Sequence, residues 1–272
     1  MILKDLEAQF VKYKNSNISY RRYGVGKKLL FCFHGYGEDA ESFAFLETIL
    51  GKNFDIIALD FPFHGLTDWK DELLFTDTDL INIIDLIASS TQKISILGYS
   101  MGGRIALHLL QTNPQKIEQL VLVAPDGFHH NIWHKISTQT FIGNKIFAFT
   151  MKHPLWMFAL MKLFYKLNLF NKSIFNFVHY YLDDENSRWM LYKRWTTMRR
   201  FHPNLHLLKM IIQKNKIPIG LLFGKFDRVI LTKHGLTFQR SLENFVEVKE
   251  IEAGHQLLKL KYAKEITDLF RS

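Results

Sequence analysis

The chain has 272 residues, of which 47% are hydrophobic and 22% charged, and this composition excludes a disordered or fibrous protein. A single cysteine, Cys32, excludes an intramolecular disulfide and with it a disulfide-stapled scaffold. The formal net charge is +9, and it is concentrated: residues 127–205 hold 11 basic and three acidic side chains, whereas the rest of the chain is nearly neutral.

No targeting segment is expected at the start of the chain. Charges interrupt the opening Met-Ile-Leu-Lys-Asp-Leu-Glu at once, and no apolar signal core follows. No window of the sequence reaches the roughly 18 uncharged apolar residues that a membrane-spanning helix needs. The expected location is the cytoplasm.

Strands and helices are expected to alternate in the first part of the chain. Two short strand-like segments come first, at 9–13 and 17–23, with turn-forming Asn15 and Ser16 between them. Buried strands are then expected at 29–33, 54–59, 93–97 and 120–124. Helices are expected at 42–50, 77–89 and 104–111. This order predicts a parallel sheet with helices on both faces.

The alternation stops at Gly127 and resumes near residue 206. Between them the chain is aromatic, basic and mainly helical in pattern, with a helix expected at 154–170. The later elements are expected as a strand at 216–223, a helix at 232–240, a strand at 244–251 and a helix at 260–270. The predicted organisation is one α/β domain, residues 1–126 and 206–272, interrupted by a helical insertion at 127–205.

The segment Gly98-Tyr99-Ser100-Met101-Gly102 places the pattern G-x-S-x-G between an expected strand and an expected helix. Small residues two positions before and after the serine suit a tight, strained turn in which neighbouring backbone packs closely. The helix that follows directs backbone N–H groups and the positive end of its dipole toward the same point. This context predicts that Ser100 is a nucleophile.

A serine nucleophile needs a base, and in this arrangement the partners follow it in the order acid, then histidine. Asp227 comes after the strand at 216–223, and His255 comes after the strand at 244–251. Both lie at the edge of the sheet that presents Ser100. His255 is the predicted general base, and Asp227 is predicted to orient it. Asp126 is the alternative acid, disfavoured because it does not lie one strand before the histidine.

Two backbone N–H groups are needed to stabilise an oxyanion. One candidate is the N–H of Met101, directly after the nucleophile. The other is the N–H of Tyr36, in the glycine-flanked loop that follows the strand at 29–33. His129, His130 and His134 have no acidic or cysteine partner nearby, so neither a metal nor a cofactor is predicted.

With these residues in place, the sequence resembles the α/β-hydrolase superfamily over essentially its whole length. The landmarks are His34-Gly35-Tyr36-Gly37, Asp60-Phe61-Pro62-Phe63-His64-Gly65, Gly98-Tyr99-Ser100-Met101-Gly102 and Gly254-His255. The second departs from the usual D-x-P-G-x-G, because Phe63 stands where glycine is common and Thr67 where serine often stands. The resemblance implies the α/β-hydrolase fold, a mostly parallel central sheet flanked by helices, with a helical cap inserted after the strand at 120–124.

The string from Gly98 to Arg104 resembles the branch that includes the menaquinone-pathway SHCHC synthase, which eliminates pyruvate. It is also similar to strings in C–C bond hydrolases and in esterases, and it is unlike epoxide hydrolases and haloalkane dehalogenases, which use aspartate at the position of Ser100. The expected function is a serine hydrolase that cleaves a carboxylic ester or thioester with an apolar acyl part through an acyl-enzyme.

Two alternatives stay open. One is a C–C hydrolase or elimination lyase on an anionic polycarboxylate, in which Arg104 faces a substrate carboxylate. The other is a catalytically silent binding protein on the same fold. The residues expected to contact substrate are Tyr36, Tyr99, Arg104 and Trp156.

Ten phenylalanines lie in the same segment as the excess positive charge. The helix expected at 154–170 is interpreted as a lid whose lysines reach water, as a wall of an apolar substrate pocket, or as a basic amphipathic helix that contacts an anionic membrane. The basic pairs at 193–194 and 199–200 are interpreted as a solvated helix face or as a site for a substrate anion. No nucleic-acid partner is expected, because no binding motif accompanies these residues.

Overall fold

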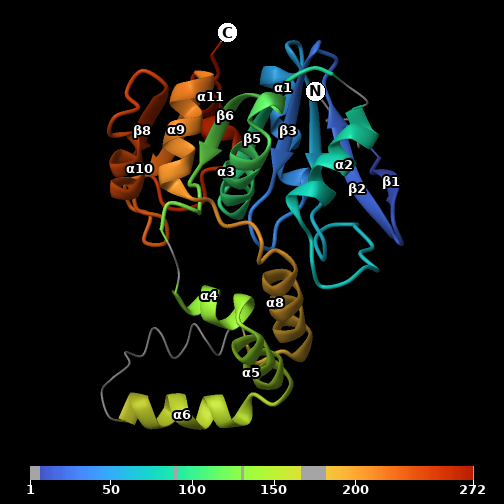
Figure 1. Cartoon of the computed structure of the whole chain (residues 1–272), viewed down its shortest axis with the longest axis vertical. Coiled ribbons are helices and arrows are strands. Elements are labelled where there is room, and N and C mark those ends of the chain that lie inside the picture. The colour runs from blue at the N-terminus through green and yellow to red at the C-terminus, as the bar shows by residue number, and fades with distance from the viewer. Residues whose placement is uncertain (1–6, 89–90, 130–131, 167–181, 272) are drawn as a thin grey trace. The chain divides into compact units, whose positions relative to one another are not determined.

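The computed structural model of the chain describes residues 7–88, 91–129, 132–166 and 182–271 (Figure 1). The chain divides into two compact units. The core unit comprises Met1–Asp71, Thr76–His129 and Phe201–Ser272, and the helical unit comprises Glu72–Phe75 and His130–Arg200. The short segment Glu72–Phe75 joins the helical unit because the N–H of Phe75 donates to the carbonyl oxygen of Thr197 at 2.9 Å.

The core unit contains an eight-stranded sheet in the order β1-β2-β4-β3-β5-β6-β7-β8 within the described residues. Its strands are β1 Gln9–Tyr13, β2 Ser16–Tyr23, β3 Lys28–Phe33, β4 Phe54–Leu59, β5 Ile94–Tyr99, β6 Ile117–Val123, β7 Ile219–Gly224 and β8 Val246–Ile251. Strand β2 pairs antiparallel with β1 and β4, and the other neighbours pair in parallel. The mostly parallel sheet predicted from the sequence is therefore confirmed.

Helices cover both faces of this sheet. The core unit contains η1 Ala40–Leu46, α1 Glu47–Leu50, α2 Asp77–Ala88, α3 Met101–Thr112, η2 Pro114–Lys116, α9 Leu205–Asn215, α10 Thr232–Gln239, η3 Leu260–Tyr262 and α11 Ala263–Thr267. The helix expected at 42–50 begins instead as a 3₁₀ helix at Ala40. There the side chain of Asp39 accepts the N–H of Glu41 at 3.0 Å, and the carboxylate of Asp60 accepts the N–H of Ala40 at 2.7 Å.

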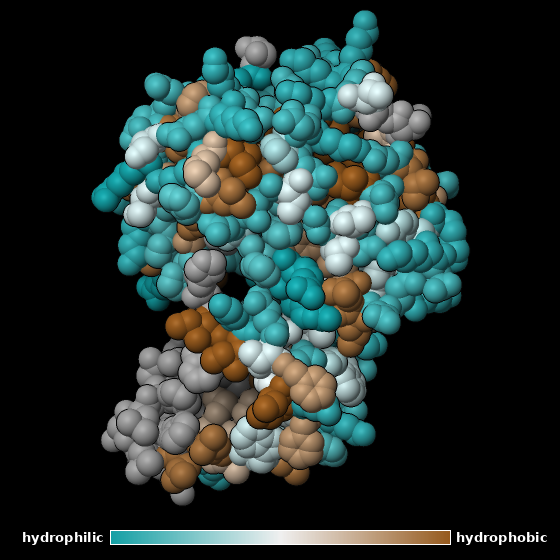
Figure 2. Space-filling view, in the orientation of Figure 1, coloured by the Kyte–Doolittle hydropathy of each residue, from teal (hydrophilic) through white to brown (hydrophobic). Residues whose placement is uncertain are grey.

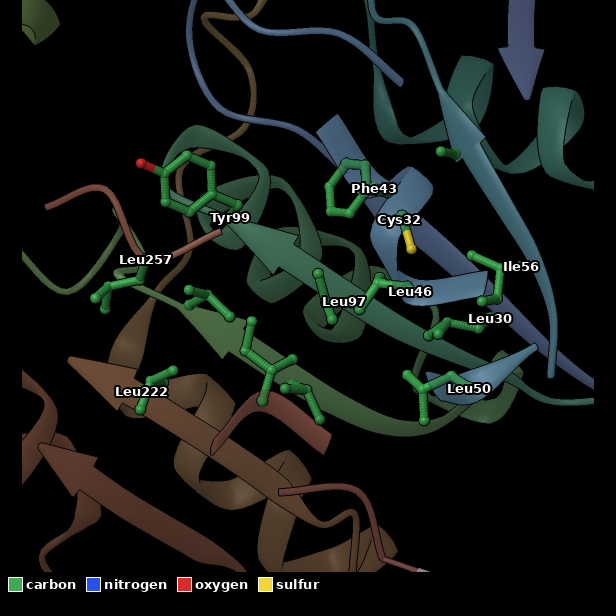
Figure 3. Close-up of a cluster of buried hydrophobic side chains, with 14 of the residues drawn as sticks. Leu30, Cys32, Phe43, Leu46, Leu50, Ile56, Leu97, Tyr99, Leu222 and Leu257 are labelled. Atoms are coloured by element: carbon green, nitrogen blue, oxygen red, sulfur yellow. The ribbon is translucent and has the colours of Figure 1, made fainter. Parts of the chain in front are cut away.

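Alternate residues of the central strands point to opposite faces. Leu30 and Cys32 of β3 belong to a buried cluster with η1, α1 and α11, shown in Figure 3. Cys32 is fully buried, and this burial raises the pKa of its thiol. Phe33, on the opposite face, packs edge-on against Phe61 at a ring distance of 5.4 Å.

The helical unit contains α4 Ile132–Gln139, α5 Phe141–Lys152, α6 Leu155–Lys166 and α8 Glu185–Thr197 among the described residues. Helix α6 corresponds to the helix expected at 154–170, of which residues 167–170 lie outside the described part. Within the described residues, no helix is both long enough and apolar enough to cross a membrane.

Candidate active site

Ser100 sits between the end of β5 and the start of α3 in a strained conformation. Its φ is 49° and its ψ is −113°, in a region that residues with a side chain rarely adopt. The backbone on both sides holds it there: its N–H donates to Val123 O at 3.0 Å, and its carbonyl oxygen accepts the N–H groups of Gly103 and Asp126, each at 2.9 Å. The turn therefore has the geometry expected of a nucleophile elbow.

The glycines beside Ser100 are required by close packing. A Cβ added to Gly102 would overlap the carbonyl oxygen of Phe33, at the end of β3. A Cβ on Gly98 would lie 2.7 Å from Gly102 O, and one on Gly103 would lie 2.5 Å from Pro125 Cβ. The start of α3 thus rests directly on neighbouring backbone, which fixes where Ser100 points.

The structure brings the three residues predicted for catalysis together. His255 Nε2 lies 3.2 Å from Ser100 Oγ, and His255 Nδ1 lies 2.7 Å from Asp227 Oδ2. The Asp227 side chain is fully buried, and its other oxygen accepts the N–H groups of Val229 at 2.7 Å and Ile230 at 3.0 Å. A histidine that donates from Nδ1 to this carboxylate keeps Nε2 free to accept the Ser100 hydroxyl proton.

The loops after β7 and β8 carry Asp227 and His255, and they are joined to each other. The N–H of Lys225 donates to Ile251 O at 2.8 Å, and the N–H of Phe226 donates to Ala253 O at 2.9 Å. A Cβ on Gly224 would overlap Gly254 O, so only glycine allows the two loops to approach this closely. These contacts place the carboxylate and the imidazole side by side.

Asp126, the alternative acid, has other partners. Its Oδ2 lies 3.2 Å from Arg104 Nη1, and its Oδ1 accepts the N–H of Gly127 at 2.7 Å. Arg104, expected to contact substrate, therefore pairs with a carboxylate of its own unit, and only 15% of its side chain is exposed. This ion pair links α3 to the loop after β6 beside the turn at Ser100.

The loop after β3 carries Tyr36, whose N–H is a candidate oxyanion donor. His34 is fully buried, and its Nε2 accepts the N–H of Phe61 at 3.1 Å, so Nδ1 carries the proton and donates to Gly35 O at 2.7 Å. That oxygen also accepts the N–H of Glu38 at 3.3 Å. Because C=O and N–H point in opposite directions across a trans peptide, fixing Gly35 O also fixes the direction of the Tyr36 N–H.

This loop lies against Ser100. A Cβ on Gly35 would lie 2.9 Å from Tyr99 Cδ1 and 3.4 Å from Ser100 Cβ. The Tyr36 ring is 38% exposed and stands edge-on to His64, with 6.0 Å between ring centroids. The loop therefore places the backbone at Gly35 next to the serine and leaves the Tyr36 ring partly open to solvent.

Tyr99 is only 3% exposed, which leaves little surface for the substrate contact predicted from the sequence. Its hydroxyl donates to the carbonyl oxygen of His255 at 3.2 Å, and its ring lies 5.7 Å from the imidazole. Burial raises the pKa of Tyr99, so the phenol keeps its proton for this hydrogen bond. Tyr99 thus supports the histidine loop.

Sequence reasoning did not single out Glu38. Burial raises the pKa of its carboxyl, an effect that the charge of His255 opposes, and its Oε2 is buried without a hydrogen-bond partner among the described residues. The only signal in the sequence is an acidic residue close after the His34-Gly35 pair. Its place in the loop of Tyr36 makes it part of the surroundings of His255.

The loop after β4 contains Phe63 at the position where glycine is common in the family that the sequence resembles. Phe63 has a φ of 63°, in the left-handed region that favours glycine. Gly65, with a φ of 50°, lies so close to Asp60 that a Cβ would overlap its carboxylate. Asp60 also accepts the N–H of Leu66 at 3.1 Å, and so it holds this loop to the start of η1.

The other residues considered in the sequence analysis have the following surroundings. Trp156 belongs to α6 of the helical unit and is 44% exposed. His129 stacks on His234 at 5.1 Å, His134 lies 4.9 Å from the ring of Trp195, and His130 lies outside the described residues. In the described part of the chain, no three His, Cys, Asp or Glu side chains form a group able to hold a metal ion.

Comparison with known proteins gives a consistent result. The family model described as "alpha/beta hydrolase fold" matches residues 28–258. An uncharacterized hydrolase of Bacillus subtilis, YugF, is 26% identical over 249 residues, covering 88% of this chain and 88% of that protein. The crystal structure of a serine hydrolase involved in carbazole degradation superposes with a TM-score of 0.63 at 20% identity, covering 97% of this chain and 98% of that one.

A more narrowly named relative matches a shorter stretch. The pimeloyl-[acyl-carrier protein] methyl ester esterase of Legionella pneumophila is 28% identical over 129 residues. The match covers 47% of this chain and 51% of the esterase, so the similarity spans about half the length of each protein.

Proposed function

The chain belongs to the alpha/beta hydrolase fold family, and we propose that it is a serine hydrolase that cleaves a carboxylic ester or thioester with an apolar acyl part. The observation that carries the proposal is the continuous line of hydrogen-bonding distances from Ser100 Oγ through His255 to Asp227. A serine, a base and a buried carboxylate in this order are the parts that acyl transfer needs.

In the proposed reaction, Ser100 Oγ attacks the carbonyl carbon of the substrate while its proton passes to His255 Nε2. The tetrahedral intermediate collapses, the C–O or C–S bond breaks, and His255 returns the proton to the leaving alkoxide or thiolate. Water then attacks the acyl-enzyme with His255 again as the base, which releases the acid and restores Ser100. Asp227 stays ionised and stabilises the imidazolium.

The oxyanion is proposed to bind the N–H groups of Met101 and Tyr36. Met101 begins α3, where unpaired N–H groups and the helix dipole favour negative charge. The Tyr36 N–H belongs to the peptide whose oxygen is held by His34 and Glu38. Donors fixed before the reaction need no reorganisation when charge develops, which is the main source of their effect.

An ester or thioester is favoured over an anionic C–C substrate. In the C–C interpretation, Arg104 binds a carboxylate of the substrate. In the structure Arg104 is instead paired with Asp126 at 3.2 Å. The Legionella relative is named as an esterase of an acyl methyl ester. Both observations support acyl-ester hydrolysis as the chemistry of this site.

The test is hydrolysis of p-nitrophenyl esters of increasing acyl length by the wild type and by Ser100→Ala, with Ser187→Ala in the helical unit as the matched control. We expect Ser100→Ala to lose activity by about 10⁴-fold or more and the control to keep it. A fluorophosphonate probe should label the wild type and not Ser100→Ala. Full activity in Ser100→Ala, or a folded wild type that the probe does not label, contradicts the proposal.

A further inference from the structure

Helix α5 turns four large hydrophobic side chains outward. Phe141 is 75% exposed, Ile142 71%, Ile146 53% and Phe149 57%. Two lysines, Lys145 and Lys152, are also exposed on this helix. With about 100° between successive residues, these six side chains fall on one arc of roughly 140°. Every exposed side chain of α5 is therefore either a large hydrophobic group or a lysine.

The opposite side of α5 is held by polar contacts. The Asn144 amide donates to Thr196 Oγ1 at 3.0 Å and to Ser137 O at 3.2 Å, and its Oδ1 accepts the hydroxyl of Tyr192 at 3.1 Å. Phe147 stands edge-on to the ring of Tyr192 at 5.4 Å. Because these partners lie on α8 and α4, they fix the rotation of α5 about its axis. The outward direction of the hydrophobic face thus follows from specific contacts on the inner face.

Helix α6 repeats the arrangement. Leu155 is 80% exposed, Trp156 44%, Leu160 40% and Leu163 50%, whereas Met161 is buried. Lys162 is exposed and falls on the same arc as the exposed hydrophobic side chains. Two helices of one unit therefore combine the same two kinds of outward side chain. Figure 2 shows hydrophobic side chains gathered on the exposed surface of this unit.

The charge on these helices is of one sign. Residues 127–182 contain six lysines and no aspartate or glutamate. Lys145 Nζ lies 4.3 Å from the centroid of the Phe141 ring, so the charge sits against the hydrophobic face itself. A surface that is both apolar and uniformly positive is complementary to one that offers hydrocarbon beneath negative charge.

We propose that the outward faces of α5 and α6 bind the surface of an anionic lipid bilayer. Large hydrophobic side chains enter the boundary between headgroups and acyl chains, and the lysines contact the negative headgroups. A second copy of this face is disfavoured because it would bring like charges together. A nucleic acid is disfavoured because isoleucine and leucine have no aromatic face for a base to stack on. The proposal does not depend on the hydrolytic activity of Ser100.

The test is flotation of the full chain with phosphatidylcholine vesicles, with and without phosphatidylglycerol, at low and at high salt. We expect binding to the anionic vesicles at low salt, and binding weaker by about tenfold or more on phosphatidylcholine alone or at high salt. Absence of binding to anionic vesicles, or equal binding to both kinds of vesicle, overturns the proposal.

Two double variants separate the two contributions of the α5 face. Lys145→Glu with Lys152→Glu reverses its charge, and Ile142→Ser with Phe149→Ser removes hydrophobic area. We expect each to weaken binding to anionic vesicles by about tenfold or more. The matched controls change the same residue types on exposed positions of the core unit, Lys52→Glu with Lys233→Glu and Leu86→Ser with Leu236→Ser. Binding by the controls should stay within about twofold of the wild type.

Two further measurements distinguish a loss of lipid binding from misfolding and from a loss of catalysis. Circular dichroism and turnover of a soluble p-nitrophenyl ester check that each variant is folded, because none of these residues belongs to the proposed active site. Ser100→Ala should bind vesicles as the wild type does, so that failure of one proposal leaves the other intact. A dimer in size-exclusion chromatography that Ile142→Ser with Phe149→Ser disperses would instead make this face an interface between copies and overturn the lipid assignment.

Discussion

The two units of this chain use hydrophobic residues in opposite ways. In the core unit, β5 is buried at every position and the central strands pack on both faces. In the helical unit, α5 points four large hydrophobic side chains outward and places Asn144 inside. The same residue types therefore stabilise the fold in one unit and form an open surface in the other. Hydrophobic composition alone does not distinguish a core from a binding surface.

The two units also differ in charge. Outside residues 127–205 the chain has 24 basic and 23 acidic side chains, whereas inside this segment it has 11 and three. The core unit pairs its charges, as Arg104 does with Asp126 and Lys14 with Asp79. If chemistry and most of the stability reside in the core unit, substitutions in the two units should differ in their effects on turnover and unfolding.

The largest expected effect is a loss of turnover when Asp227, the acid of the proposed triad, is substituted. Asp227→Asn should lower kcat/KM by about 10³–10⁴-fold, because the buried partner of His255 Nδ1 no longer stabilises the correct tautomer or the imidazolium. Asp126→Asn should cost less than about tenfold, since Asp126 contacts Arg104 instead. Esterase assays on both purified variants give the comparison. Equal losses in the two would contradict the assignment of the acid.

The next largest effect is expected on stability. It is tested by comparing one leucine from each unit. Leu97 in β5 is fully buried, so Leu97→Ala should lower the free energy of unfolding by about 3–4 kcal/mol through lost burial and an internal cavity. Leu155, at 80% exposure, should tolerate the same change within about 0.5 kcal/mol. Denaturant unfolding of the two variants measures this difference. A cost above about 2 kcal/mol for Leu155→Ala would mean that its side chain is covered in solution.

A smaller effect is expected from the polar contacts that orient α5. Asn144→Ala removes hydrogen bonds to Ser137, Thr196 and Tyr192 and should destabilise the helical unit by about 1–2 kcal/mol. Hydrogen exchange of the α5 amides should then become faster, while exchange in the sheet stays unchanged. Asn186→Ala, at an exposed position of α8, is the matched control. Unchanged exchange in Asn144→Ala would show that other contacts orient the helix.

The smallest effect concerns pH and Glu38. Burial raises the pKa of this carboxyl, with Asp39 adding to the rise and His255 and Lys259 opposing it. The folded state therefore binds more protons than the unfolded state between the unfolded and folded pKa values. Stability from this group is present below the ordinary glutamate pKa of 4.5 and is lost as pH rises through the folded pKa.

Glu38→Gln should accordingly be slightly more stable than the wild type at pH 7, and the difference should shrink at pH 4. Urea unfolding at the two pH values measures it. Glu247→Gln, at an exposed position of β8, serves as the control. A variant less stable than the wild type at pH 7 would show that the Glu38 carboxylate is favourably paired in solution.

How well the sequence predicts a feature depends on how far apart in the chain the interacting residues lie. The alternating pattern of buried strands and helices predicted the core sheet, and the order of Ser100, Asp227 and His255 predicted which side chains would meet. Both depend on local rules: the periodicity of burial, the chemistry of a tight turn, and the fact that parallel strands end at one edge. The context of a few residues around each position carries that information.

Other features depend on partners far away in the chain. The sequence suggested that Tyr99 contacts substrate and that Arg104 either does so or braces the turn at Ser100. In the structure Arg104 pairs with Asp126, and Tyr99 donates to the carbonyl oxygen of His255, 156 positions later. The single helix expected at 42–50 begins earlier, as a 3₁₀ helix at Ala40, whose N–H is accepted by Asp60 from another strand end. Pairings of this kind do not appear in any window of sequence.

The sequence by itself determined the fold class, the tight turn at Ser100 and the positive charge of residues 127–205. Tertiary structure alone decided which side of α5 faces outward, because an amphipathic pattern gives the separation of two faces but not which of them is covered. That choice rests on Asn144, which finds Tyr192 and Thr196 about fifty positions away, at separations of 48 and 52 residues. Turning the partly buried amide toward its hydrogen-bond partners leaves Ile142, Phe149 and the two lysines on the outside.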